Sequence, residues 1–113
     1  MFALSGQKVG LNICFDLNFP TATQAVTDQG AGVLLCPCNN MMPLAKAEKY
    51  KPLHNAIRAE RCREAHVWMV SADVTGSRDG RISYGPTAAL NPCGEVVDQV
   101  PLMTEGMIVV DIE

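Results

Sequence analysis

The sequence predicts an α/β fold in which a strand, a helix, a strand, a helix and a strand follow one another and a β meander completes the chain. Apolar residues alternate or form short runs in three segments that suit strands, and helical spacing fills the two gaps between them. After Asp73 the helical spacing disappears, and turn residues separate short apolar runs. Strands joined by helical crossovers pair in parallel, so the first three strands should form one parallel sheet. With 113 residues, we expect one domain.

The first strand and the first helix are predicted over residues 8–14 and 21–30. Apolar residues alternate along the first of these segments, which is the spacing of a strand with one buried face. Thr21 and Gln24 fit a capping box at the start of the helix, and Gly30 fits its end. A short turn should therefore connect the strand to the helix.

The second strand and the second helix follow in the same order. Residues 31–37 form a compact apolar run that ends in proline, as expected of a strand covered on both faces. We expect a polar loop over residues 38–50. Pro52 suits the first turn of a helix, and apolar residues recur at helical spacing to Ala65, with Arg and Glu on the opposite face. Residues 67–72 are predicted to form the third strand.

The remainder of the chain predicts a meander without helices. A loop at residues 77–81 precedes two strands that a turn at residues 91–94 connects, and one more strand closes the fold. No internal repeat or low-complexity tract interrupts this order. The predicted strands are residues 82–90, 95–100 and 107–112.

Composition and charge exclude several classes of function. The nine Lys and Arg residues are dispersed or interleaved with Glu, and the formal net charge is -3, so we expect no nucleic-acid partner. No apolar run reaches membrane-spanning length and the first residues lack the pattern of a signal peptide, so we expect no membrane association and a cytoplasmic location. The five cysteines are then expected to be free thiols.

Chemistry should gather where the three parallel strands end, because ligands bind at this carboxyl edge in open α/β folds. Cys14 would end the first strand there, next to backbone N–H groups that can bind an oxyanion. The residue type and its position allow two interpretations, a nucleophile or a buried core thiol. The other polar side chains predicted at this edge are Asp16, Cys36, Cys38, Ser71 and Asp73.

Three further interpretations of Cys14 depend on its neighbours. His54 begins the second helix and returns to the same edge, so a dyad of Cys14 and His54 is geometrically allowed, whereas His66 lies at the other end of that helix. The three cysteines at this edge, together with His54, also offer metal ligands, but Cys36 and Cys38 are separated by one residue, fewer than structural zinc sites prefer. The same thiols also allow a redox-sensitive site.

Segments of the chain, in order and with matching gaps, resemble one known family. GLNICFDLNFP resembles that family's nucleophile motif, in which a strand ends in Ile-Cys-Tyr-Asp and runs on to Phe-Pro. GAGVLLCP resembles its Gly-Ala-Asp strand, and RCREAHVWMVSADVTG resembles its Arg-Ala-x-Glu-Asn helix, next strand and Asn-x-x-Gly turn. TAALNPCGEVV resembles its Ser-x-x-x-Asp-Pro-x-Gly hairpin, and EGMIVVDI its closing strand. The family is the nitrilase superfamily, the carbon-nitrogen hydrolases, and the likeness covers nearly the whole chain.

The resemblance implies both a fold and a site. The fold would be part of a four-layer α-β-β-α sandwich, with residues 1–113 as one partial carbon-nitrogen hydrolase domain. Cys14 would attack the carbon of a small-molecule amide, carbamoyl or nitrile group and form a thioester, and the backbone N–H of Phe15 would stabilise the oxyanion. No cofactor and no metal is expected. The candidates for the substrate pocket are Asp16, Cys38 and Asp73.

Departures from the family pattern bear on activity. The family's catalytic Glu and Lys precede the nucleophile by long stretches, but only thirteen residues precede Cys14. We therefore expect the nucleophile-bearing half of a hydrolase, inactive alone, that forms a homo-oligomer or joins a complementing N-terminal half; the alternative is a degenerate, non-catalytic paralogue that self-associates. Asp73 stands where the family has Asn, and its negative charge would disfavour the Cys14 thiolate. The other exchanged positions are Thr21, Gln24, Cys62 and Thr87.

Overall fold

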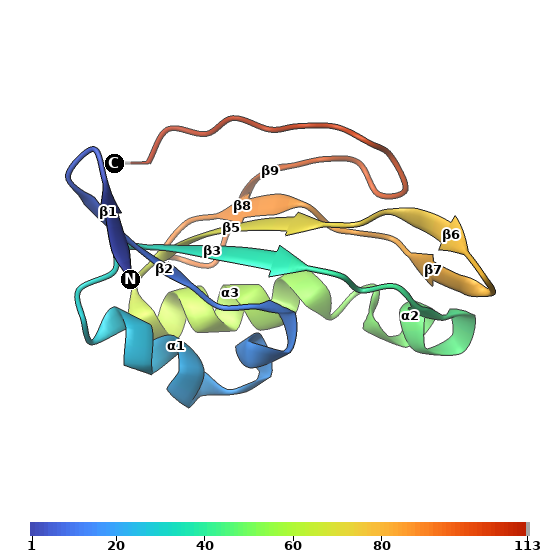
Figure 1. Ribbon diagram of the computed structural model, residues 1–113, viewed down its shortest axis with the longest axis horizontal. Coiled ribbons are helices and arrows are strands. Elements are labelled where there is room, and N and C mark those ends of the chain that lie inside the picture. Colours follow the sequence, from blue (N-terminus) through green and yellow to red (C-terminus); the bar gives the residue numbers. More distant parts are fainter. Residues whose placement is uncertain (113) are drawn as a thin grey trace.

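A mixed six-stranded sheet forms the centre of the computed structural model, which describes residues 1–112 (Figure 1). Across the sheet, the strands are β1 (Phe2–Leu4), β2 (Gln7–Leu11), β3 (Val33–Cys38), β5 (Trp68–Asp73), β8 (Ala88–Leu90) and β9 (Val96–Gln99). A smaller sheet contains, in spatial order, β4 (Met42–Pro43), β7 (Arg81–Ser83) and β6 (Gly76–Arg78). It extends the molecule at one end (Figure 1).

The three central strands pair in parallel, as the sequence predicts. Val33 of β3 lies opposite Val9 of β2 on one side and opposite Trp68 of β5 on the other. The outer pairs are antiparallel: β1 pairs with β2 at one edge, and β8 and β9 follow β5 toward the other edge. The predicted order of strand, helix, strand, helix and strand is therefore confirmed, and β1 is an additional edge strand that the sequence analysis did not identify.

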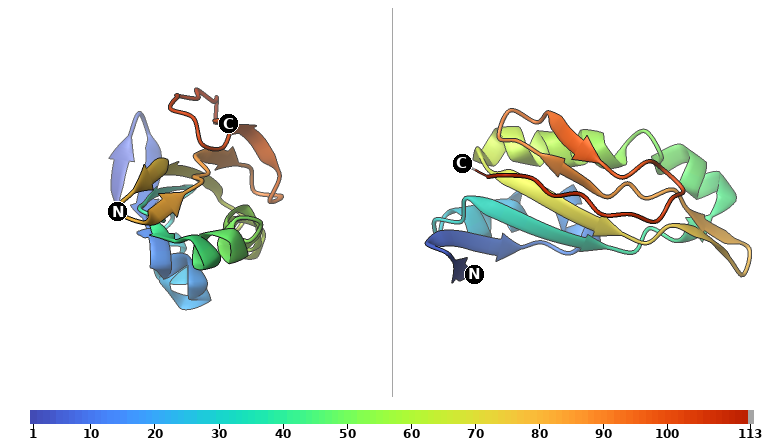
Figure 2. Two further views of the ribbon diagram at one scale, coloured as in Figure 1. Left: turned by 90° about the vertical axis from the view of Figure 1, so that its right-hand side faces the viewer. Right: turned by 90° about the horizontal axis from the view of Figure 1, so that it is seen from above.

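Helices cover one face of the sheet. α1 (Pro20–Thr27) and α3 (His54–Ala65) lie on the same side of the central strands (Figures 1 and 2). The core between these helices and the sheet is closed to solvent, since Leu34, Cys62 and Met69 are each 0% exposed. Among residues 1–112, no helix has the length and apolar character needed to cross a membrane.

One glycine sets the distance between α1 and the sheet. A Cβ atom at Gly10 would lie 1.9 Å from Val26 Cγ1 and 3.3 Å from Leu34 Cδ2. Atoms that are not bonded do not approach to the first of these distances, so a side chain at this position would push the helix away from β2. Gly10 thus allows α1 to pack directly on the strand that leads to Cys14.

The first strand is shorter than predicted. β2 ends at Leu11, and Cys14 begins a 3₁₀ helix, η1 (Cys14–Asn18), instead of ending a strand. Asn12 turns into the protein, where its side chain accepts a hydrogen bond of 2.9 Å from Thr23 Oγ1 on α1. The Asn12 N–H still donates to the Leu35 carbonyl of β3 at 3.2 Å, and the buried side-chain contact holds the turn before Cys14 against the helix layer.

Both helices begin at other residues than predicted. Phe19 is the N-cap of α1 and Pro20 its first residue, so Thr21 lies inside the first turn and caps nothing. Proline is favoured at this first position because its fixed φ suits the helix and its missing N–H would have no partner there. α3 begins at His54, two residues after Pro52, because a turn at residues 51–53 separates it from the preceding helix.

Residues 38–50 are not a loop, contrary to the prediction. They contain β4 and a further helix, α2 (Leu44–Tyr50). β4 pairs with β7, and β7 pairs with β6, so the predicted loop at residues 77–81 belongs mostly to a hairpin. The sequence gives little signal for β4, β6 and β7 because each of these strands has only two or three residues.

Two predictions for the meander are also wrong. Residues 82–90 divide into β7 and β8, because Gly85 has a positive φ of 95° and Pro86 lacks the N–H that a strand ladder needs. Residues 107–112 pair with no strand in the described part of the chain, and Met107 and Val109 are 85% and 79% exposed. Their apolar pattern suits a strand, but a strand needs a partner.

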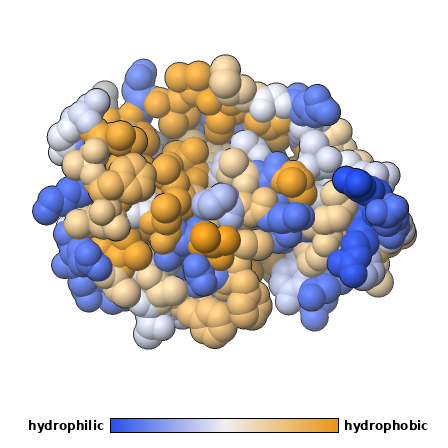
Figure 3. Space-filling view, in the orientation of Figure 1, coloured by the Kyte–Doolittle hydropathy of each residue, from blue (hydrophilic) through white to orange (hydrophobic). Residues whose placement is uncertain are grey.

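The face of the sheet opposite the helices is apolar, and no helix of residues 1–112 covers it. Val9, Leu35 and Val70 line an open groove on this side, which Ile112 also borders. The C-terminal segment crosses over this face (Figures 1 and 2). In Figure 3, hydrophobic residues gather away from the β6 and β7 hairpin, whose end is hydrophilic. The chain thus supplies one large sheet with a helix layer on one face, and a small sheet at one end.

Candidate active site

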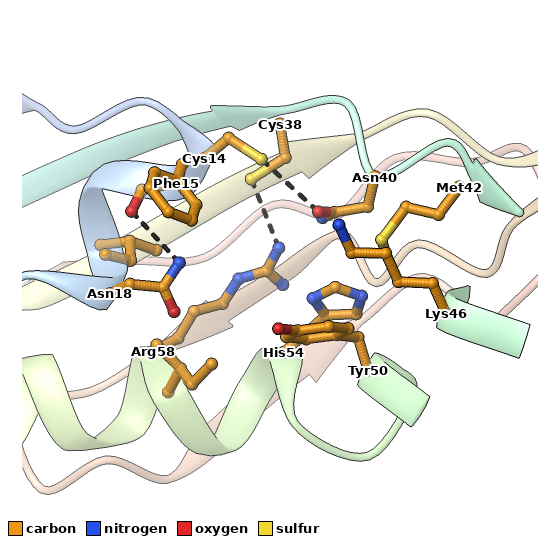
Figure 4. A pocket seen from close by; sticks show the side chains of 12 residues that line it. Cys14, Phe15, Asn18, Cys38, Asn40, Met42, Lys46, Tyr50, His54 and Arg58 are labelled. Carbon is orange, nitrogen blue, oxygen red and sulfur yellow. Dashed lines mark hydrogen bonds between the residues drawn. The ribbon is translucent and has the colours of Figure 1, made fainter. Parts of the chain in front are cut away.

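A cavity of about 120 Å³ opens beside Cys14 at the predicted edge of the sheet (Figure 4). It lies between η1, the end of β3, and the helices α2 and α3. One water molecule occupies about 30 Å³ in the liquid, so the cavity has room for a small organic molecule. Its walls are formed by Cys14, Phe15, Leu17, Asn18, Cys38, Asn40, Met42, Lys46, Tyr50, His54, Ile57 and Arg58.

Cys14 is half-buried and adopts a left-handed backbone, with a φ of 43°. Residues with a Cβ rarely adopt this conformation, and such strain is common at functional sites. The turn is held from both sides: the Ile13 N–H donates to Asp16 Oδ2 at 2.9 Å, and the Asp16 N–H donates to the Ile13 carbonyl at 2.9 Å. The Asp16 carboxylate therefore supports the backbone, and Asp16 does not line the cavity.

The backbone directly after Cys14 supplies an unused donor. Within residues 1–112, the Phe15 N–H donates no hydrogen bond. The Phe15 ring is exposed and contacts Phe19 edge to face, with 5.3 Å between the ring centroids. A backbone N–H without a partner, adjacent to a thiol in a cavity wall, is suited to bind a developing oxyanion.

Asn40 connects Cys14 to a buried carboxylate, and no pattern in the sequence points to Asn40. Cys14 Sγ donates to Asn40 Oδ1 at 3.5 Å. Asn40 donates from its backbone N–H to Asp73 Oδ1 at 3.1 Å, and from its side-chain amide to Asp73 Oδ2. An ionised carboxylate can only accept, so Asp73 holds the amide nitrogen and leaves the amide oxygen facing Cys14. In the sequence, Asn40 is one polar residue among several in a predicted loop.

Arg58 offsets the charge of Asp73 inside the protein. Arg58 Nη2 lies 3.8 Å from Asp73 Oδ2, and their side chains are 2% and 0% exposed. Arg58 also donates to the Pro86 carbonyl at 2.8 Å and to Cys38 Sγ at 3.5 Å. The sequence pattern placed the arginines of α3 on its solvent face, but Arg58 and Arg61 are buried. For Arg58, a carboxylate and a carbonyl compensate the cost of burying the guanidinium.

Burial dominates the ionisation of Cys14. Burial raises the pKa of the Cys14 thiol, a hydrogen bond from the Asn39 N–H lowers it, and the neighbouring Cys38 and Asp73 raise it further. The neutral thiol is therefore favoured in this chain. The predicted effect of Asp73 has the expected direction, but it is smaller than the effect of burial.

Cys36 and Cys38 form a thiol pair beside Cys14. Their sulfur atoms lie 3.6 Å apart on the same face of β3, with Cys38 in the cavity wall and Cys36 buried behind it. The hydrogen bond between them lowers the pKa of Cys36 and raises that of Cys38 far above its usual range. No group of three or more His, Cys, Asp or Glu among residues 1–112 could hold a metal ion.

His54 lines the cavity from the first turn of α3, at the edge where the sequence predicts it. Its ring stacks on Tyr50, with 6.1 Å between centroids and an interplanar angle of 27°. Burial and the nearby charge of Arg58 lower the pKa of His54, which keeps the imidazole neutral near pH 7. In the described part of the chain, His54 makes no hydrogen bond to Cys14. The two residues share a cavity without forming a dyad.

Comparison with known proteins identifies the family. The family model described as carbon-nitrogen hydrolase matches residues 1–113, and the chain belongs to this family, within the nitrilase superfamily. The chain is 33% identical over 107 residues, 94% of its length, to a deaminated glutathione amidase of Dictyostelium discoideum. It is also 33% identical over 113 residues, 100% of its length, to a nitrilase of Pyrococcus abyssi.

Solved structures share the fold. An amidase from Nesterenkonia sp. AN1 matches with a TM-score of 0.84 over 99% of this chain and 41% of its own, at 22% identity. A carbon-nitrogen hydrolase from Helicobacter pylori G27 matches with a TM-score of 0.79 over 88% of this chain and 38% of its own, at 15% identity. The chain spans 35% and 40% of the two curated relatives. The predicted family and nitrilase-like fold are confirmed.

Proposed function

We propose that Cys14 is the nucleophile of a hydrolase that cleaves the non-peptide carbon-nitrogen bonds of small amide, carbamoyl or nitrile compounds. The position of Cys14 carries this proposal: a half-buried thiol on left-handed backbone, in the wall of a cavity and next to the unused N–H of Phe15. A mutant of the Nesterenkonia amidase, which has the same fold, carries acrylamide added at its active-site cysteine. This supports a thiol as the reacting group.

With an amide substrate, the Cys14 thiolate attacks the carbonyl carbon and a carbon-sulfur bond forms. The carbonyl electron pair moves onto oxygen, where the Phe15 N–H stabilises it. The carbon-nitrogen bond then breaks, the amine leaves with a proton, and the acyl group remains on sulfur as a thioester. Water attacks the thioester carbon, the carboxylic acid leaves, and the Cys14 thiol is restored.

Activation of Cys14 requires groups that residues 1–112 do not place in the cavity. Burial raises the pKa of Cys14, and no carboxylate of these residues lines the cavity as a base. The family resemblance implies a Glu as general base and a Lys for the oxyanion, both from a segment before the nucleophile. We infer that these groups come from the rest of the protein or from a partner chain, and that this chain alone is inactive.

The face of the sheet opposite the helices is the place where such a partner would pack. Leu35 and Val70 present an apolar surface there, in a groove that the buried Val9 also lines. A second sheet on this surface would bury it and complete a four-layer sandwich. The occupant is a complementing N-terminal half or a second copy of this chain.

Ammonia release by the intact protein tests the proposed reaction. Cys14→Ala should reduce the hydrolysis of small amides and nitriles to background, and rapid quenching should reveal an acyl adduct on the peptide that contains Cys14. Cys93→Ala is the matched control, because this thiol is exposed and lies outside the cavity. Turnover that survives Cys14→Ala would refute the proposal. A folded, assembled protein without turnover on any such compound would favour the degenerate, non-catalytic alternative.

A further inference from the structure

Three of the five cysteines meet at the wall of the cavity, although the formation of a thioester needs only one thiol. Cys14 and Cys38 line the cavity, and Cys36 is buried behind Cys38, with 3.6 Å between the two sulfur atoms. All three are free thiols. The proposed hydrolysis uses Cys14 and leaves Cys36 and Cys38 without a function.

Cys38 is the thiol that Cys14 meets inside the cavity. Cys14 belongs to η1 and Cys38 ends β3, and their sulfur atoms point toward one another (Figure 4). A hydrogen bond between these two thiols contributes, after burial, to the raised pKa of Cys14. Both side chains are only half-buried, so a small reagent in the cavity reaches them. Two thiols from separate segments of the chain are therefore in contact at an open site.

Cys36 is close to Cys38 but is poorly placed to form a disulfide with it. The two residues lie on the same face of one strand, where alternate Cβ atoms are about 6.6 Å apart. A disulfide needs about 3.5–4.5 Å between the Cβ atoms. β3 pairs with β5 over its whole length, through Cys38, so the strand cannot shorten to bring them together. Cys14 has no such restriction, because it lies on a different element.

We propose that a hydroperoxide converts Cys14 and Cys38 into a reversible disulfide, which protects Cys14 from irreversible oxidation and blocks it as a nucleophile until a thiol reduces the bond. The cavity, of about 120 Å³, has room for a small peroxide beside Cys14, since one water molecule occupies about 30 Å³ in the liquid. Formation of the disulfide does not depend on the proposed hydrolase function. Only its effect on turnover does.

The disulfide forms in two steps. The Cys14 sulfur attacks one oxygen of the hydroperoxide, the oxygen–oxygen bond breaks, and Cys14 becomes a sulfenic acid while the other oxygen leaves with the thiol proton. Cys38 Sγ then attacks the sulfenic sulfur, a sulfur–sulfur bond forms, and the hydroxyl group leaves with the Cys38 proton as water. The two thiols together lose two electrons to the hydroperoxide. A cellular thiol reverses the reaction by thiol–disulfide exchange.

Peptide mapping of the intact protein after treatment with hydrogen peroxide identifies the bond. Remaining thiols are first blocked with N-ethylmaleimide. Proteolysis before Asp16 and Asp28 then separates Cys14 from the two cysteines of β3. We expect a disulfide-linked pair of peptides, one with Cys14 and one with Cys38, that dithiothreitol separates.

Three variants assign the partner of Cys14. Cys38→Ala should abolish the linked pair, and Cys14 should then proceed to sulfinic and sulfonic acid, which dithiothreitol does not reduce. Cys38→Ser keeps the size of the side chain and should give the same result, which separates the loss of the thiol from a defect in packing. Cys36→Ala is the matched control on the same strand and should retain the linked pair.

Several results would overturn the proposal. These are a linked pair that survives Cys38→Ala, a disulfide within β3 in place of one to η1, no reaction of Cys14 with hydrogen peroxide, and irreversible oxidation of Cys14 that is as fast in the unaltered protein as in Cys38→Ala.

Ammonia release from small amides by the intact protein is a separate measurement. It should fall as the linked pair forms, and it should return when dithiothreitol reduces the bond. A disulfide that forms in a protein without turnover, or turnover that continues while Cys14 is linked, contradicts the hydrolase function alone and leaves the disulfide standing.

Discussion

Asn40 donates two hydrogen bonds to Asp73, one from its backbone N–H at 3.1 Å and one from its side-chain amide. Both of these donors face the carboxylate, so the amide oxygen lies 3.5 Å from Cys14 Sγ and accepts the thiol proton. Asp73 thereby determines that Cys14 faces the oxygen of the Asn40 amide and not its nitrogen. An acceptor at this position stabilises the protonated thiol and opposes the thiolate.

Asp73→Asn should lower the apparent pKa of Cys14. Burial, the main cause of the raised value, remains, but the variant removes a negative charge and allows Asn40 to turn its amide N–H toward the sulfur. The pH profile of the iodoacetamide rate at Cys14 should move to lower pH. Asp98→Asn is the control, because it removes the same charge from an exposed position on β9. An unchanged profile, or a shift to higher pH, would contradict the role of Asp73.

The same substitution should reduce stability. It leaves the Arg58 guanidinium buried without its carboxylate, and breaking a buried ion pair in this way costs about 3 kcal/mol. Urea titrations should show this loss in the free energy of unfolding, and Asp98→Asn should show almost none. A double variant with Arg58→Met should recover part of the loss, since it removes the unpaired charge.

Stability should fall in mildly acidic solution because of His54. Burial and Arg58 lower its pKa in the folded protein, so below about pH 6.5, the usual histidine value, the unfolded chain binds a proton that the folded protein resists. This contribution to stability is complete above that pH and is lost as the pH falls toward the lowered pKa. The urea midpoint at pH 5.5 should therefore be lower than at pH 7.5, and His54→Gln should reduce the difference. His66→Gln, at the far end of α3, should preserve it.

Leu35→Lys should prevent assembly through the open face of the sheet. Leu35 lines the groove on that face, and a charge there would be buried without a partner if another layer packed on it. Sedimentation velocity of the intact protein should show a lower share of assembled species for this variant. Leu53→Lys is the control on the helix side, where Leu53 is 38% exposed. Equal assembly of both variants would place the interface elsewhere.

Local patterns predict the central sheet well because strand and helix spacing are properties of neighbouring residues. β2, β3, β5 and the two covering helices follow this spacing. Residues 107–112 have the same kind of pattern but form no strand, since pairing depends on a partner that the described residues do not provide. The short strands β4, β6 and β7 escape prediction for the opposite reason: contacts between distant segments form them with little local signal.

In the candidate site, too, local patterns predict some residues, and contacts between distant segments determine the others. The sequence placed Cys14, Cys38 and His54 at one edge, and all three line the cavity. It gave no reason to single out Asn40, and it placed Arg58 on a solvent face because helical charges alternate there. Asp73 reaches Asn40 and Arg58 only in the folded chain, so no pattern of neighbouring residues predicts these contacts.

The backbone at Cys14 also restricts which nucleophiles could evolve or be engineered at this turn. At a φ of 43°, a Cβ already costs about 1–2 kcal/mol, and a second substituent on Cβ adds to the crowding. Threonine, although it carries a hydroxyl, is therefore a poor replacement, whereas serine keeps an unbranched Cβ. A primary alcohol can therefore replace the thiol at this turn. The backbone conformation disfavours a secondary alcohol, whatever its reactivity.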